Sequence, residues 1–345
     1  MKQKIIFSSF LVICFYSMIC SKISAQYLDY TMSSYPEYYS TNILSSISAG
    51  KGNTGVASSG DVSLIYLNPA TLNINNKFQV NASYNLKSES SNTLSQNLYS
   101  FSFAGAYRIN KNFQVGLAYQ NDYSYERDAL MHLFQEYFYD AYKFETHSFR
   151  VPFVYEYKWF RVGMNTNLSF YKASYSEDVM GSFWKLIPEI GTVVTPIKEF
   201  SIGASFIPGF KSDFKYNTDD NMYLIDRPYA KYPDRIKIGT EFRTSDNDTK
   251  FTIDYHYANM SNFSYVDDLK DIHFGFEHLI DENWAFRCGF FSNSKGNDNH
   301  IYFLTFGTSF ILNNYSVNLA GLVSMDSKSG KGEYYVLNFG AGYEF

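Results

Sequence analysis

Residues 78–87 read Phe-Gln-Val-Asn-Ala-Ser-Tyr-Asn-Leu-Lys, and this strict alternation of apolar and polar side chains decides the fold. The same period of two recurs in residues 113–120, 160–170 and 315–324. Because successive side chains of a strand point to opposite faces, each stretch predicts a long strand with one apolar and one polar face. A soluble sandwich would have shorter strands and would not turn so many small polar side chains toward its core.

The rest of the chain extends this pattern to about fourteen strands. They are expected near 77–87, 97–108, 112–123, 145–157, 159–175, 186–196, 199–212, 233–243, 249–258, 270–280, 283–294, 299–311, 314–325 and 334–345. Tight turns, such as Asn110-Lys111 and Asn313-Asn314, alternate with longer polar links, such as 124–144 and 213–232. Short turns at one end and long loops at the other are typical of an outer-membrane β-barrel whose termini are both periplasmic.

The composition favours the same all-β class. Aromatic residues make up 19% of the chain, with 32 Tyr and 32 Phe, yet the mean hydropathy is −0.27. A barrel in lipid needs an apolar outer band, aromatic girdles at both interfaces and a polar interior. Beyond the N-terminal region no run approaches 18 apolar residues, so helical spans are excluded and a closed barrel remains.

The N-terminal residues have the layout of a secretory signal peptide. Lys2 and Lys4 precede an apolar run over 5–19, and Ser24-Ala25 offers small residues for cleavage before Gln26. An N-terminal anchor helix is the alternative. Removal of 1–25 leaves Cys288 as the single cysteine, so no intrachain disulfide is expected. It also removes three lysines and no acid, which takes the net charge from −5 to −8 and argues against a nucleic-acid partner.

The final strand carries a second export feature. One face of it presents six apolar side chains, and the chain stops at the last of them: Tyr335, Leu337, Phe339, Ala341, Tyr343 and Phe345. Bacterial barrels often end with an aromatic residue that the barrel assembly machinery reads. We therefore predict that Phe345 is the insertion signal.

About fifty residues, 26–76, separate the predicted signal peptide from the first strand. Their most distinctive part is Ala49-Gly50-Lys51-Gly52-Asn53-Thr54-Gly55-Val56-Ala57, followed by an Asp-Val-Ser at 61–63 and by Asn68-Pro69-Ala70. This is not a phosphate loop, because the Gly-Lys-Ser/Thr ending is missing. The glycines are expected to allow tight backbone packing inside a barrel. The predicted organisation is thus a signal peptide at 1–25, a lumenal segment at 26–76 and a barrel at 77–345.

These motifs resemble those of the FadL/TodX family of outer-membrane transporters. Besides Asn68-Pro69-Ala70, the stretches 190–206 and 232–239 are similar to a hairpin and a following strand of that family. The resemblance implies a barrel of about fourteen strands plugged by an N-terminal hatch, with Asn68, Pro69 and Ala70 as the hatch motif. It also implies passive uptake of hydrophobic molecules such as long-chain fatty acids.

One loop is suited to collecting such molecules. Residues 128–142 place apolar side chains at helical spacing, and the candidate docking residues are Leu130, Leu133, Phe134, Tyr137 and Phe138. An exposed apolar helix of this kind can gather lipid-like ligands. The alternative is a loop helix that packs on the barrel rim.

Charged residues on the polar faces are expected to pair with one another or with the lumenal segment. They are Arg150, Glu156, Arg161, Glu189, Lys237, Glu241, Arg243, Asp254, Glu277 and Arg287. A carboxylate-binding site among them is the alternative. No esterase elbow, metalloprotease motif or Cys/His cluster is present, so we predict no catalytic residues, no metal site and no cofactor.

A second function stays open beside transport. The type IX secretion system of Bacteroidetes uses FadL-like barrels that bind secretion-system proteins and transport no small molecule, and the stretch from 49 to 70 also resembles their N-terminal segments. The expected partners are therefore hydrophobic small molecules or lipids, outer-membrane lipid and, in the second case, secretion proteins. Finally, at least one of Pro152, Pro188 and Pro208 is predicted to interrupt strand pairing and open the wall.

Overall fold

The computed structural model describes residues 45–91, 94–126, 142–175, 178–213, 215–216, 229–259, 268–294, 300–325 and 333–345. The predicted signal peptide and the candidate docking residues Leu130, Leu133, Phe134, Tyr137 and Phe138 lie outside these ranges. Among the described residues, no helix has the length and apolar character needed to cross a membrane.

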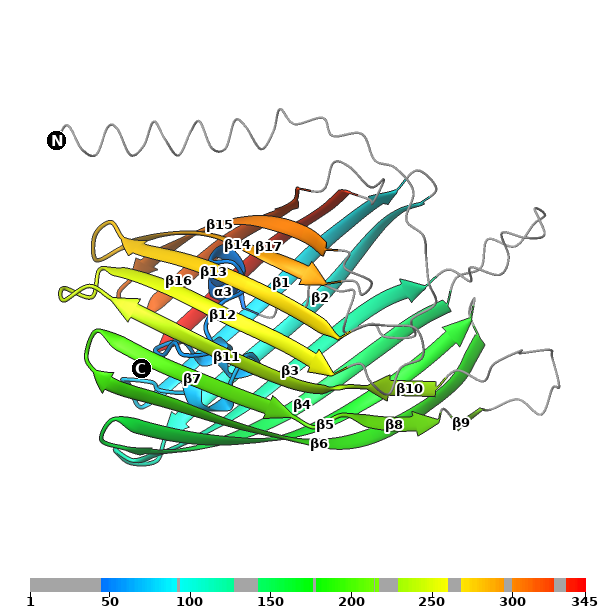
Figure 1. The fold of residues 1–345 in the computed structure, drawn as a ribbon, viewed down its shortest axis with the longest axis horizontal. Coiled ribbons are helices and arrows are strands. Elements are labelled where there is room, and N and C mark those ends of the chain that lie inside the picture. The colour runs from blue at the N-terminus through cyan, green and yellow to red at the C-terminus, as the bar shows by residue number, and fades with distance from the viewer. Residues whose placement is uncertain are drawn as a thin grey trace.

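Fourteen long antiparallel strands form a closed barrel (Figure 1). They are β1 (Phe78–Ser91), β2 (Leu94–Arg108), β3 (Phe113–Glu126), β4 (Tyr142–Tyr157), β5 (Phe160–Tyr175), β6 (Asp178–Ile197), β7 (Phe200–Ile207), β11 (Asp234–Arg243), β12 (Thr249–Asn259), β13 (Leu269–Leu279), β14 (Trp284–Ser294), β15 (His300–Leu312), β16 (Tyr315–Ser324) and β17 (Glu333–Glu344). Three short strands, β8 (Phe210–Asp213), β9 (Lys215–Tyr216) and β10 (Tyr229–Tyr232), extend the wall at one end.

The barrel closes where the first strand meets the last. β1 and β17 pair in register from Gln79 opposite Glu344 to Ser90 opposite Glu333. Phe78 and Phe345 complete the ladder by donating their N–H groups to each other's carbonyl oxygens, at 2.8 and 2.9 Å. The C-terminus therefore lies at the end of the barrel that carries the tight turns (Figure 1).

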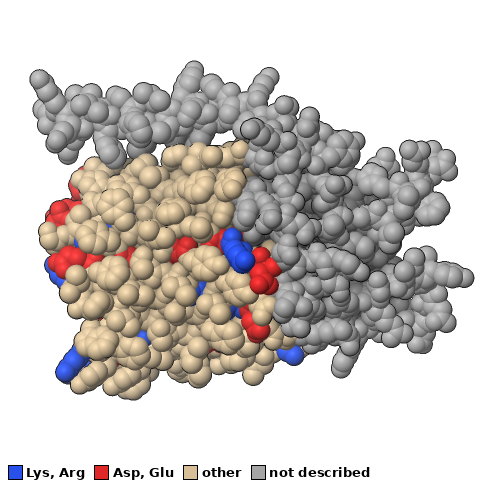
Figure 2. Space-filling model, in the orientation of Figure 1, with Lys and Arg blue, Asp and Glu red and all other residues tan. Residues whose placement is uncertain are grey.

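The alternation seen in the sequence separates an outer from an inner face. On β1, Tyr84 and Leu86 are exposed while Asn85 is buried, and β5 repeats this with exposed Met164 and buried Asn165. Figure 2 shows one outer face that is mostly free of charge, with charged residues mainly at its turn end and beside the grey residues. Exposed apolar residues all round a barrel are what a lipid environment requires.

The expected all-β barrel of about fourteen strands is confirmed, with three local differences. β6 begins at Asp178 rather than near 186, because residues 178–185 continue to pair with β5. The expected seventh strand is broken into β7 and β8 at Pro208-Gly209. The link expected at 213–232 contains the short strands β9 and β10.

Candidate functional site

Residues 45–77, called here the inner segment, lie inside the barrel. They form the helix α3 (Ser46–Gly50) and two 3-10 helices, η1 (Val62–Tyr66) and η2 (Pro69–Thr71). Each begins at a side chain that accepts a backbone N–H: Ser45 from Ser48, Asp61 from Ser63 and Asn68 from Ala70. Such caps allow very short helices to persist without a long hydrogen-bonded run. Burial raises the pKa of the Asp61 carboxyl above its ordinary value.

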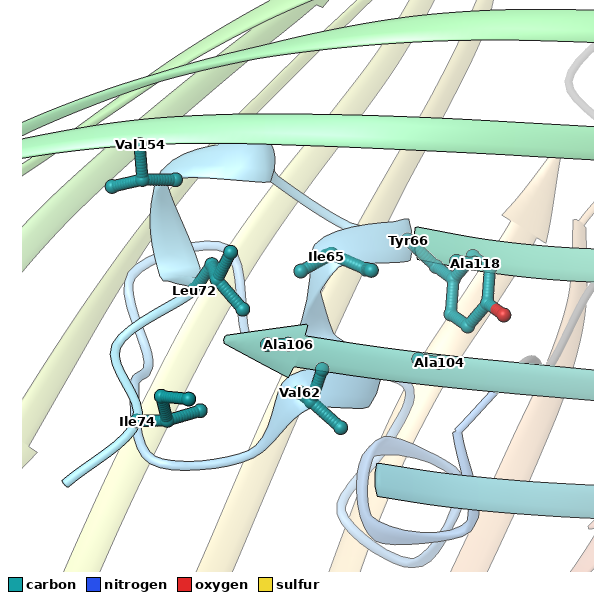
Figure 3. Close-up of a cluster of buried hydrophobic side chains, with 9 residues drawn as sticks. All are labelled: Val62, Ile65, Tyr66, Leu72, Ile74, Ala104, Ala106, Ala118 and Val154. Atoms are coloured by element: carbon teal, nitrogen blue, oxygen red, sulfur yellow. The ribbon is translucent and has the colours of Figure 1, made fainter. Parts of the chain in front are cut away.

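An apolar cluster holds one side of the inner segment against the wall (Figure 3). Small side chains on β2, β3 and β4 face larger ones on the inner segment, and the cluster comprises Val62, Ile65, Tyr66, Leu72, Ile74, Ala104, Ala106, Ala118 and Val154. The Tyr66 hydroxyl donates toward the carbonyl oxygens of Phe103 and Tyr119, at 2.7 and 2.9 Å. Alanines on the wall leave room for this packing.

Eight glycines of the barrel strands, called here the glycine belt, let the inner segment pack directly against the backbone of the wall. A Cβ built on any of them would lie within 3.0 Å of an inner-segment atom; they are Gly163, Gly191, Gly203, Gly239, Gly275, Gly289, Gly307 and Gly340. Gly340 of β17 meets Ser46, Gly307 of β15 meets Gly50, and Gly163 of β5 meets Ala70. The inner segment therefore follows the inside of the wall strand by strand.

Hydrogen bonds fasten the inner segment to strands β12, β13 and β15. Asp254 Oδ2 accepts the backbone N–H groups of Gly55 and Val56 at 2.7 and 3.0 Å. Thr305 Oγ1 accepts the Gly52 N–H at 2.8 Å, and His273 Nδ1 donates to the Gly52 carbonyl at 2.9 Å. These bonds satisfy backbone groups that would otherwise be buried without partners.

Asn68, Pro69 and Ala70 fasten the opposite side. Asn68 is fully buried, and its amide donates to the Val56 carbonyl at 2.7 Å and to the Thr192 carbonyl of β6 at 3.0 Å. Its Oδ1 accepts the Ala70 N–H at 3.0 Å. One amide thus links two parts of the inner segment to the wall, next to Gly191 of the glycine belt.

Several of the charged lumenal residues form ion pairs, as expected. Arg150 lies 3.3 Å from Glu189, Arg243 lies 2.6 Å from Glu241, and Glu277 bridges Lys250 and Arg287 at 2.7 and 2.6 Å. Ser58 of the inner segment also donates to Glu241. Pairing of this kind compensates for the loss of hydration. Among the described residues, no group of three or more candidate ligands has a geometry suited to a metal ion.

The prediction that proline interrupts strand pairing is confirmed at two places. Between β3 and β4, Val115 pairs with Phe153 and Ala118 with Arg150, and the two positions between them are unpaired. This break is short. The Pro152 ring also fills it, since it lies 2.9 Å from the place where Gly116 would carry a Cβ.

The second interruption is long, and we call it the β6–β8 seam. β6 and β7 pair up to Ile190 opposite Phe206, a register that places Pro188 opposite Pro208. Pairing on this side of β6 resumes only at Ser182 opposite Lys215 of β9. Within the described chain, residues 183–189 therefore have no ladder partner across from 207–213. Proline lacks the N–H that a ladder needs, which explains why pairing stops there.

Aromatic side chains cover the lumenal side of the seam. Tyr171 of β5 stacks on Phe183 of β6, with ring centroids 4.8 Å apart. Phe210 of β8 lies 5.9 Å from Tyr171 and 6.5 Å from Phe183, and the Lys185 Nζ lies 5.0 Å from the Phe210 ring. Sequence reasoning missed both this cluster and the glycine belt. The belt glycines lie on the polar faces of their strands, and this was the signal in the sequence that could have indicated close packing against the lumenal side.

Comparison with solved structures identifies the fold. The chain resembles a Pseudomonas aeruginosa FadL homologue (TM-score 0.69, 12% identity) over 88% of this chain and 98% of the other. It resembles the Ralstonia pickettii toluene transporter TbuX (0.68, 13%) over 87% and 97%, and the Pseudomonas putida toluene transporter TodX (0.64, 9%) over 86% and 96%. No family profile and no curated protein sequence matches. The chain therefore has a FadL-like barrel fold.

Proposed function

We propose that this chain is an outer-membrane channel for hydrophobic molecules, with the inner segment as its hatch. The observation that carries the proposal is an apolar patch at each of two places on the inner wall, although the lumen of a simple barrel pore is polar. On β14 to β17 this apolar patch consists of Phe291, Phe303, Ala320, Leu322 and Val336, together with Ala49 of α3. On β5 to β7 it consists of Tyr171, Phe183, Ile187 and Ile207.

Several features support this reading. The exposed apolar band suits a lipid bilayer, and the termini of the barrel lie at its short-turn end, which is periplasmic in outer-membrane barrels. The similar structures named above include two toluene transporters. Long-chain fatty acids are the substrate class that we propose first, with small aromatic hydrocarbons as the competing class. Asn68, Pro69 and Ala70 would then fasten the hatch, and Phe345 would direct insertion by the barrel assembly machinery.

The test compares uptake by cells of a Gram-negative host that do or do not produce the full chain. We expect the chain to accelerate entry of oleate and of the uncharged dye N-phenyl-1-naphthylamine, but not entry of a sugar of similar mass. Mass spectrometry of the detergent-purified barrel should identify co-purified lipid. Equal entry with and without the chain would contradict the proposal. Capture of secreted proteins by a barrel free of lipid would instead favour the secretion-accessory function.

A further inference from the structure

We propose that the outer wall of β3, β4 and β5 binds the phosphate of an outer-leaflet lipid headgroup, with Lys172 as the residue that contacts it. The site consists of Tyr119, Glu145, His147 and Lys172, called here the polar chain. The site does not depend on what passes through the lumen. Its placement in the outer leaflet follows from the orientation proposed above, in which the short turns are periplasmic.

The polar chain lies on the outer face of the barrel. Phe149 of β4 is exposed, and His147 and Glu145 occupy alternate positions before it, so all three side chains share the lipid-facing side of the strand. Lys172 of β5 lies directly opposite Glu145, and Tyr119 of β3 lies directly opposite Phe149. Because directly opposed residues of neighbouring strands point to the same face, Lys172 and Tyr119 also face outward.

The height of the polar chain on the wall matches the outer boundary of the apolar band. Toward the short turns, β4 next exposes Phe149, Phe153, Tyr155 and Tyr157. A tilted strand crosses the hydrocarbon layer with about 9–11 residues, and the stretch from 147 to 157 has this length. Charged side chains on the lipid face are costly at the bilayer centre but are tolerated near the interface. The polar chain therefore lies at the level of the outer-leaflet headgroups.

Polar contacts hold the four side chains in one array across three strands. The Tyr119 hydroxyl lies 2.8 Å from His147 Nδ1, and His147 Nε2 lies 2.9 Å from Glu145 Oε1. The other carboxylate oxygen, Oε2 of Glu145, lies 3.4 Å from Lys172 Nζ. Because an ionised carboxylate can only accept, His147 Nε2 carries the hydrogen of its bond to Glu145. His147 thus fixes the carboxylate, and the carboxylate in turn orients the Lys172 ammonium.

The positive end of the polar chain is more open to the surroundings than its negative part. The Lys172 side chain is 32% exposed, whereas the Glu145 side chain is 16% exposed. An ammonium has three donors, and within the described ranges Glu145 accepts from one of them, so donors remain for an anion. Lipid headgroups of bacterial membranes carry their negative charge mainly as phosphate, which attracts basic side chains at the membrane surface. A phosphate that approaches this wall meets the ammonium before the carboxylate.

The wall next to the polar chain suits acyl chains, which favours a lipid over free phosphate. The Phe170 ring centroid lies 6.3 Å from that of His147 and 4.9 Å from that of Trp184 on β6. The Phe149 ring lies 5.0 Å from the Tyr119 ring, and both Trp184 and Phe149 are exposed. A headgroup held by the polar chain would therefore place its acyl chains against aromatic rings, as at the interfacial girdles of barrels.

The test measures lipid binding to the full chain, purified in detergent, by native mass spectrometry. The probes are lipid A with both phosphates, the same lipid with its phosphates removed, and inorganic phosphate. We expect the wild-type barrel to retain phosphorylated lipid A and to retain neither of the other two probes to a similar extent. Lys172→Gln should weaken lipid A binding about tenfold, the effect of one charge-assisted hydrogen bond. The matched control is Lys270→Gln, which removes an exposed lysine from β13 and should bind as wild type.

A second variant tests the sign of the charge effect. Glu145→Gln keeps an oxygen for Lys172 but removes the negative charge beside the proposed phosphate, so it should bind lipid A more tightly than wild type. Heat-modifiable migration on gels verifies that each variant is folded.

Three results would overturn the lipid site. They are equal lipid A binding by Lys172→Gln and Lys270→Gln, equal retention of the phosphorylated and dephosphorylated lipid by wild type, and weaker lipid A binding by Glu145→Gln. The last result would indicate a metal ion that bridges the carboxylate to the phosphate. None of these results bears on the channel function, which dye entry tests separately.

Discussion

The carboxylate of Asp254 on β12 accepts the backbone N–H of Gly55 at 2.7 Å, which ties the inner segment to the wall. The same oxygen accepts the N–H of Val56. Asp254→Ala would leave two buried donors without a partner, at a cost of roughly 1–3 kcal/mol each. We expect faster hydrogen exchange at these two amides and a larger ion conductance in planar bilayers. Asp246→Ala, in an exposed turn, is the control. Unchanged exchange in the Asp254 variant would show that this contact does not hold the inner segment.

The glycine belt predicts a sharp steric effect at Gly307. Valine there would place its Cβ 2.8 Å from the Cα of Gly50, and neither backbone can retreat easily. We expect Gly307→Val to refold poorly in detergent, measured as the fraction of barrel that resists SDS without heating. The matched control is Gly321→Val on the neighbouring strand, where the nearest atom to the new Cβ is 3.9 Å away. Similar refolding yields for both variants would show that the inner segment tolerates displacement.

Asn68 combines two roles that substitution can separate. Asn68→Asp keeps an oxygen to accept the Ala70 N–H but removes the amide that donates to Val56 and Thr192. Asn68→Ala removes both functions. We expect protease cleavage of the inner segment in folded barrels to increase in the order wild type, Asp, Ala. If the aspartate variant resists cleavage as well as wild type, the link to β6 contributes little to the hatch.

Asp61 offers a test that depends on charge. Burial raises the pKa of this carboxyl, so its charged form is disfavoured in the folded barrel. The stability of the barrel therefore decreases as the pH rises from the ordinary pKa of an aspartate toward the raised pKa of Asp61 in the folded chain. Asp61→Asn keeps a capping oxygen without a charge and should match or exceed wild-type stability at neutral pH. Asp61→Ala should lose about 1 kcal/mol. Urea unfolding monitored by gel mobility measures all three, and a less stable Asn variant would contradict the argument.

Phe345 is predicted to act through its side chain, since its backbone bonds to Phe78 are available to any residue. Its ring lies 4.8 Å from that of Phe78 and 5.1 Å from that of Tyr343. We expect Phe345→Ser to reduce the amount of barrel in outer-membrane fractions several-fold, while the equivalent change at exposed Tyr315 has less effect. Equal recovery of the two variants would remove Phe345 from the insertion signal.

The strands were predictable because lipid and a polar interior impose a two-residue period that is visible in the sequence. Asn68-Pro69-Ala70 was recognisable as a short motif, and in the structure it forms the cap and the first two residues of η2. Pro188 and Pro208 indicated a weak point in strand pairing. That they lie opposite each other depends on the register of β6 and β7, which no local sequence pattern contains. The glycine belt was missed for a similar reason. A glycine on a polar face looks like any small residue until the atom opposite it is known.

The glycine belt also has a consequence for the order of assembly. Wall and inner segment are in backbone contact around much of the circumference, so a barrel that closed empty would have no room through which to admit the segment sideways. The inner segment precedes β1 in the chain, and the β1–β17 ladder is the joint between the first and last strands. We therefore expect the inner segment to act as a template around which the strands assemble. We expect a chain that lacks the inner segment either to form no closed barrel or to form a barrel of different circumference.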